Sequence, residues 1–257
     1  YKIGKKIMNR SHSFWSLGFF TAGLLGALFS QNEITPTFHF TGSFFIGSLL
    51  VFYFSFRYEI AGSRPNSNHK TSIFVLPNKG VLALVVFTLS AMLIEGAGID
   101  WSVIFMRDVF GTPAFLNGTA LFLGALAQFA VRYFADSIVE RYGAETVARA
   151  SIVTMFIGLG MICLTNNPYI ALLGFALMGG GTAVLFPLAV SAAAQKSDRS
   201  AATNVASLAQ LSFVVFLLGP PLLGFIAENY GIRASFAICS PLLFLSWIFV
   251  FSLKQKV

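Results

Sequence analysis

Long apolar segments separated by short polar ones run along almost the whole chain. A helix needs roughly 20 predominantly apolar residues to cross the hydrocarbon core of a bilayer, and eight segments approach or reach that length. A transmembrane β-barrel would instead show strands of about ten residues with alternating polarity. The pattern therefore predicts an all-α membrane protein with eight transmembrane helices, at Ser13–Ser30, Phe38–Phe56, Gly80–Trp101, Ala114–Ala135, Val147–Leu164, Tyr169–Ala194, Val205–Ile226 and Ala234–Leu253.

One polar connection is much longer than the others. Residues 58–79 carry many turn-forming and charged residues, whereas most other connections are a few residues long. Short connections make successive helices antiparallel neighbours, while a long polar linker lets two groups of helices move separately. We therefore expect two helices in residues 1–57, a cytoplasmic linker in residues 58–79, and a six-helix bundle in residues 80–257.

The composition points to the lipid bilayer as a partner. Charged residues make up 11% of the chain, against about 25% in soluble domains, and the mean hydropathy is +0.76. The net charge of +7 does not indicate nucleic acid, because the basic residues form no single patch and stand in small groups between apolar runs. Cys163, Cys239 and the scattered histidines form no ligand cluster, so we expect no metal and no cofactor.

The basic residues also predict the orientation. Cytoplasmic connections of membrane proteins are enriched in Lys and Arg. With the N-terminus inside, Arg107 and Arg233 are the two basic residues on the outer side, and the C-terminus is cytoplasmic. The other fifteen of the 17 fall on the inner side: Lys2, Lys5, Lys6, Arg10, Arg57, Arg64, Lys70, Lys79, Arg132, Arg141, Arg149, Lys196, Arg199, Lys254 and Lys256.

Several motifs, in order and on consistent sides, carry a family resemblance. They are Glu95–Ser102 followed by Arg107-Asp108, the loop Asp136–Gly143, the stretches Gly179–Pro187 and Gly219–Ala227, and the opening Ser11–Gly18. Together they resemble the major facilitator superfamily, closest to its bacterial fucose-permease-like and uncharacterised sugar-permease-like branch. The resemblance implies that the chain is a fragment covering roughly helices five to twelve. The missing N-terminal helices of the same protein would then be a partner, with residues 1–57 holding the last two helices of the N-terminal bundle.

Polar residues inside the predicted helices are candidates for binding a solute or a proton. Glu95 lies in an otherwise apolar helix, where a carboxylate costs several kcal/mol and commonly has a functional role. Amides can bind hydroxyl groups through paired donors and acceptors, but they can equally join helices. Asp100 is next to Trp101, a typical interface residue, and fits a solvated helix end better than a binding site. The candidates are Glu95, Asp100, Asn117, Gln128, Asn204 and Gln210.

The loop after the fourth helix resembles the superfamily's inter-helix motif, in which Asp-Arg-x-Gly follows a glycine. Glu140-Arg141-Tyr142-Gly143 matches its core with Glu for Asp, while Asp136 stands where the leading glycine would be. The resemblance implies a gating latch, and a carboxylate fits beside the positive N-terminus of another helix. Arg132 and Asp136 are four apart and could pair. The alternative is an ordinary charged loop, so the gating candidates are Arg132, Asp136, Glu140, Arg141 and Gly143.

Small residues predict where helices approach and bend. Gly18, Ala22 and Gly26 are four apart and would form a ridge for close packing. The glycines 179–181 with Pro187, and Gly219 with two following prolines, would loosen or kink their helices.

These features favour a secondary transporter of a small polar solute, with a sugar or related metabolite as one candidate. The chain lacks a Gly-x-x-x-x-Gly-Lys-Ser/Thr loop for ATP, so an ion gradient would supply the energy. Glu95 makes protons the preferred ion. We expect a monomer in a bacterial inner membrane rather than an enzyme. An integral-membrane enzyme and a non-transporting channel or scaffold remain alternatives.

Overall fold

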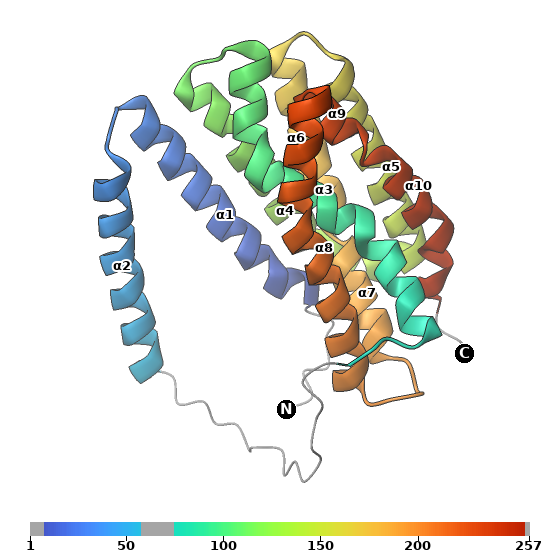
Figure 1. Cartoon of the computed structure of the whole chain (residues 1–257). Helices are drawn as coiled ribbons and strands as arrows, with labels where there is room; N and C mark the ends of the chain where they lie inside the picture. Colours follow the sequence, from blue (N-terminus) through green and yellow to red (C-terminus); the bar gives the residue numbers. More distant parts are fainter. Residues whose placement is uncertain (1–7, 58–74, 255–257) are drawn as a thin grey trace.

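The computed structural model describes residues 8–57 and 75–254, and every regular element within those ranges is a helix (Figure 1). Eight segments are long and apolar enough to cross a membrane, which confirms the predicted all-α membrane fold. The elements are α1 (Met8–Gln31), α2 (Pro36–Arg57), α3 (Lys79–Phe110), α4 (Ala114–Tyr142), α5 (Ala144–Leu164), α6 (Pro168–Thr182), α7 (Leu185–Ala194), α8 (Ala201–Tyr230), α9 (Ile232–Ala237), α10 (Ser240–Ile248) and the 3₁₀ helix η1 (Phe249–Leu253).

The helices extend beyond the apolar segments that predict them. α3 continues past Trp101 to Phe110, and α4 continues past Ala135 to Tyr142. Each ends at a glycine with positive φ, Gly111 at 60° and Gly143 at 82°, a conformation that glycine adopts without steric cost. Most of the predicted linker, residues 58–74, lies outside the described residues.

The sixth predicted span is interrupted, as its glycines and proline indicate. α6 ends at Thr182 and α7 begins at Leu185, with Ala183 and Val184 between them. The run through Pro220 and Pro221 behaves differently, because α8 continues through both prolines as a single helix. Glycine and proline therefore break one of these two spans and leave the other continuous.

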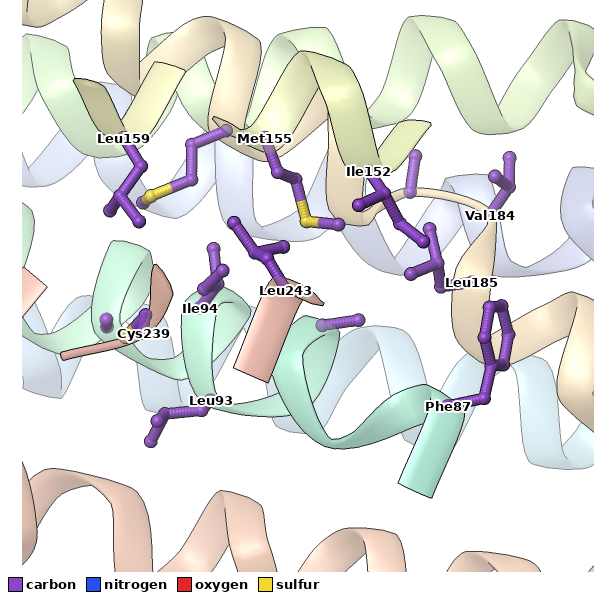
Figure 2. Close-up of a cluster of buried hydrophobic side chains, with 14 of the residues drawn as sticks. Phe87, Leu93, Ile94, Ile152, Met155, Leu159, Val184, Leu185, Cys239 and Leu243 are labelled. Atoms are coloured by element: carbon purple, nitrogen blue, oxygen red, sulfur yellow. The ribbon is translucent and has the colours of Figure 1, made fainter. Parts of the chain in front are cut away.

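α3 is the central helix, and it contacts α4, α6, α7, α8, α9, α10 and η1 around a shared apolar core. Figure 2 shows the core with Phe87 and Ile94 of α3, Met155 of α5, Leu185 of α7 and Leu243 of α10. These five side chains are fully buried. A helix surrounded in this way holds its polar side chains in fixed positions, which matters for Glu95.

α1 packs along the length of α4, whereas α2 stands outside the bundle with no buried residue (Figure 1). A Cβ added at Gly118 of α4 would lie 2.5 Å from the Cβ of Ala27, so the two helices meet there without room for a side chain. Gly23 lies on the same contact face. Within the described residues the predicted ridge makes no close packing contact, because a Cβ added at Gly18 or Gly26 would meet no atom within 4 Å. The face of α1 that packs on α4 is displaced from the predicted ridge by one residue, or about 100° around the helix.

Candidate functional site

Arg132 is a buried cation in the middle of α4. Its residue is 3% exposed, its Nε donates a 2.8 Å hydrogen bond to the carbonyl of Ala183, and its Nη1 donates a 2.7 Å bond to Ser16 Oγ. The sequence prediction counted Arg132 among the inner connections and offered Asp136 as its partner. The structure corrects both points. α4 continues for ten residues after Arg132, to Tyr142, so Arg132 lies inside the helix. Its guanidinium bonds to residues outside α4 and not to Asp136.

The break between α6 and α7 supplies one of these acceptors. In an unbroken helix the carbonyl of Ala183 would accept a hydrogen bond from the residue four positions later, which is Pro187. Proline has no N–H, so that carbonyl has no donor of its own. A buried carbonyl without a donor is costly, and Arg132 Nε satisfies it. The break and the buried arginine therefore stabilise each other.

Glu95 of α3 faces Arg132. Arg132 Nη2 lies 3.2 Å from Glu95 Oε2 and 3.3 Å from Oε1, and the two side chains are 4% and 10% exposed for Arg132 and Glu95. Charge-assisted hydrogen bonds are usually about 2.7–2.9 Å long, so this contact is longer than the arginine's other two. Arg132 thus donates to both oxygens of the Glu95 carboxylate.

Gln128 connects this pair to the neighbouring helices. Ser16 Oγ donates to Gln128 Oε1 at 2.7 Å, and Gln128 Nε2 donates to Thr182 Oγ1 at 3.2 Å. Thr182 in turn donates to the carbonyl of Gly179 at 2.9 Å. The network thus joins α1, α4 and the break after α6. Buried polar groups that are all paired hold one arrangement, which fixes the direction of the Arg132 guanidinium.

A cavity of about 420 Å³ opens beside the ion pair. Such a volume lies within the roughly 300–1,000 Å³ range of small-molecule sites. Trp15 and Phe213 are 64% and 55% exposed, so they form an accessible rim above the buried charges. A smaller space of about 40 Å³ adjoins the other side of Glu95 and reaches Gln128. The larger cavity is lined by His12, Trp15, Met92, Glu95, Ile99, Arg132, Phe186, Phe213 and Phe216.

Glu95 lies near half the length of α3. Glu95 is 16 residues after Lys79 and 15 residues before Phe110, so it is about 24 Å from the start of α3 at 1.5 Å per residue. This depth is in the middle of a spanning helix. The carboxylate beside the cavity is therefore far from both ends of a helix long enough to span a membrane.

Comparison with known proteins identifies the family. The family model of the Major Facilitator Superfamily matches residues 5–213 and 82–256. The chain belongs to the major facilitator superfamily. An uncharacterized transporter of Sinorhizobium fredii is 32% identical over 240 residues, which cover 92% of this chain and 62% of the relative. An uncharacterized MFS-type transporter of Yersinia pestis is 28% identical over 69% of this chain and 46% of its own length.

A third relative, the membrane protein MosC of Rhizobium meliloti, is 27% identical over 65% of this chain and 41% of its own length. The chain thus spans less than two thirds of each of these relatives. The chain is thus a member of this family with several helices long enough to span a membrane, and two of these three relatives are named transporters.

Four of the predicted solute-binding residues do not line the cavity. Asp100 is exposed on α3, and Asn117 accepts a 2.5 Å hydrogen bond from Thr112 at the start of its own helix. Asn204 is fully buried and donates to the carbonyl of Lys196 and to Asp198, while Gln210 accepts from the backbone N–H of Val75. These contacts fix helix ends, which is the alternative that the sequence left open for amides.

The predicted gating loop contacts the beginning of α1. Asp136 accepts a 2.7 Å hydrogen bond from Asn9 Nδ2 and a 3.2 Å bond from the backbone N–H of Arg10. The Arg10 guanidinium donates to Tyr133 Oη at 2.7 Å and lies 4.6 Å from the centre of that ring. The Asp136 carboxylate of α4 thus lies beside the first turn of α1, where the helix dipole favours a negative charge.

The rest of that loop has simpler surroundings. Glu140 and Arg141 are exposed, and the Arg141 guanidinium lies 5.2 Å from the ring centre of Tyr142. Gly143 ends α4 and precedes α5, with its N–H bonded to the carbonyl of Val139.

Several residues of the site are missing from the sequence prediction. Ser16, Thr182 and the aromatic residues of the rim are common in membrane helices, so their sequence carries no signal. Arg132 was predicted as a gating residue and not as part of the cavity. Its sequence does carry a signal, because a cation stands inside the apolar run from Leu121 to Tyr133. Counting such a cation as buried, rather than assigning it to the nearest loop, would have found it.

Proposed function

We propose that the full-length protein is a secondary active transporter that moves a small polar solute across a bacterial inner membrane by alternating access, coupled to protons through Glu95. The observation that carries this proposal is the Glu95–Arg132 pair in the wall of the 420 Å³ cavity, halfway along α3. Ionisable residues at this depth are costly and commonly mark a solute or proton path. The bacterial origin of the relatives supports a bacterial inner membrane as the location. A sugar or related metabolite is one candidate solute.

Glu95→Gln tests the coupling. Glutamine keeps an oxygen that can accept from Arg132 but removes the group that binds a proton. In proteoliposomes of the full-length protein, screened with labelled sugars, organic acids and amino acids, the wild type should accumulate its solute when a proton gradient is imposed. The variant should lose at least tenfold of that accumulation and keep exchange of solute without a gradient.

Glu228→Gln is the matched control, because Glu228 is exposed near the end of α8. It should accumulate solute as the wild type does. Normal accumulation by Glu95→Gln would contradict the role of Glu95. Flux that never saturates with solute would instead indicate a channel, and no flux of any solute would favour a scaffold or an enzyme.

We also propose that the contact between Asp136 and the first turn of α1 holds one conformational state, with Glu140, Arg141 and Gly143 forming the rest of the gating loop. Its hydrogen bonds and helix-dipole term are together worth about 1 kcal/mol, or roughly fivefold in population. Asp136→Ala should therefore speed alkylation of a cysteine replacing the buried Ser13 about fivefold, in a protein whose native cysteines are serine. An unchanged rate would argue against the latch.

The proposed orientation places the C-terminus and the α7–α8 connection in the cytoplasm. Lys196→Cys should then react with an impermeant maleimide only after cells are opened, whereas Asp108→Cys should react in intact spheroplasts. Reaction of both from the same side would refute this orientation.

A further inference from the structure

The cavity combines a cation held firmly by two hydrogen bonds with a carboxylate that contacts it at longer distance. Arg132 is held at Nε by the carbonyl of Ala183 and at Nη1 by Ser16, at 2.8 and 2.7 Å. Its contact with Glu95 through Nη2 is longer, at 3.2 and 3.3 Å. When the pair separates, Glu95 is therefore the side chain that moves. Nη2 then offers hydrogen-bond donors towards the cavity.

The walls around this cation are apolar. Trp15, Phe186, Phe213 and Phe216 line the cavity together with Met92 and Ile99. A sugar would need several amide or hydroxyl groups around it. None of the amides that favoured a sugar lines this cavity, and the nearest, Gln128, already uses its oxygen and nitrogen on Ser16 and Thr182. The lining fits a solute with one charged group and a flat apolar body.

The charges decide the sign of that group. Arginine stays protonated in proteins, while a carboxylate can take up a proton. A cationic solute at Glu95 would place two positive charges, its own and that of Arg132, beside one carboxylate. Arg132 cannot lose its proton, so the site would keep a net positive charge. An anionic solute at Arg132 leaves one extra negative charge, which protonation of Glu95 removes. The site can therefore become neutral around an anion but not around a cation.

We infer that the cavity binds an organic monoanion with an aromatic or similar apolar body, of the aromatic carboxylate class. Its carboxylate replaces Glu95 at Nη2 of Arg132, and the displaced Glu95 takes a proton from water. This inference rests on the proposed transport function and specifies its solute. Because anion and proton bind together, the two move in the same direction.

One other titratable group faces this exchange. Among the described residues that line the spaces beside Glu95, the titratable ones besides Glu95 itself are Arg132 of α4 and His12 of α1. The residues from α6, α7 and α8 are apolar or uncharged. A proton count must therefore separate Glu95 from His12, which the Glu95→Gln variant does.

Benzoate and benzamide are the probes, because they share a shape and differ in charge. The full-length protein in detergent is titrated with each, with excitation at 295 nm so that Trp15 at the rim reports binding and Trp15→Phe identifies its signal. Benzoate should bind at least tenfold more tightly than benzamide. In weakly buffered solution with a pH dye, each benzoate bound should take up about one proton.

Glu95→Gln should still bind benzoate, with the proton uptake lost, and Glu228→Gln should behave as the wild type. Equal binding of benzoate and benzamide, or unchanged proton uptake in Glu95→Gln, would overturn the inference. The probe comparison uses the unaltered protein, so it does not depend on a variant folding. Gradient-driven transport of a sugar with which benzoate does not compete would refute this solute class alone, whereas transport of no solute at all would refute the proposed function.

Discussion

Replacing Arg132 with methionine should be one of the most destabilising single substitutions in the bundle. Methionine keeps a long apolar stem but leaves Glu95 as a buried carboxylate without its cation. It also leaves the Ala183 carbonyl and Ser16 Oγ without the donors that the guanidinium supplies.

The magnitude follows from these losses. Removing one partner of a buried ion pair costs about 3–5 kcal/mol, and each acceptor without a donor costs about 1–3 kcal/mol. The total is lowered by water, because the Glu95 side chain is 10% exposed beside the cavity and can be hydrated or protonated there. We therefore expect the free energy of unfolding to fall by about 3–5 kcal/mol. Adding Glu95→Leu removes the unpaired charge and should recover about 2 kcal/mol, because apolar pairs often replace buried ion pairs at little cost.

Unfolding in mixed micelles with rising dodecyl sulfate, followed by circular dichroism, measures these differences. Arg107→Met is the matched control, since the Arg107 side chain is 63% exposed and pairs with the exposed Asp108. It should leave the unfolding transition close to that of the wild type, because exposed ion pairs contribute little to stability. If Arg132→Met were as mild as the control, or if the double variant were no more stable than Arg132→Met alone, the buried pair would not have the energetic role assigned to it.

Two further substitutions test how the helices are held. Gly118→Ala should destabilise the protein by about 1–3 kcal/mol, because its Cβ would lie 2.5 Å from that of Ala27. Gly18→Ala should be neutral or stabilising in the same unfolding assay. Equal effects would contradict the close contact of α1 with α4. Pro187→Ala restores an N–H for the Ala183 carbonyl, so it should release Arg132 Nε and lower gradient-driven transport at least tenfold without lowering stability; unchanged transport would refute the proposed link between the break and the site.

The sequence by itself determined the spanning helices of this protein. A backbone in hydrocarbon must pair its own N–H and C=O groups, so an apolar run of the right length has helix as its conformation whatever its neighbours are. All eight predicted spans are present for this reason. The break before Pro187 was also predicted, although the same reasoning failed at Pro220 and Pro221, where α8 continues as one helix. Glu95 was also visible, because a carboxylate in an apolar run is costly anywhere.

The faces and partners of these helices depended on the tertiary structure. Sequence spacing predicted a ridge of Gly18, Ala22 and Gly26 on α1, whereas packing against α4 uses the face with Gly23 and Ala27. Arg132 is 37 residues from Glu95 and 116 from Ser16, distances over which no local rule operates. The partner of a buried charge is set by which helices lie next to each other and how each is rotated. Those two quantities are decided by packing over the whole bundle, and with them the chemistry of the cavity.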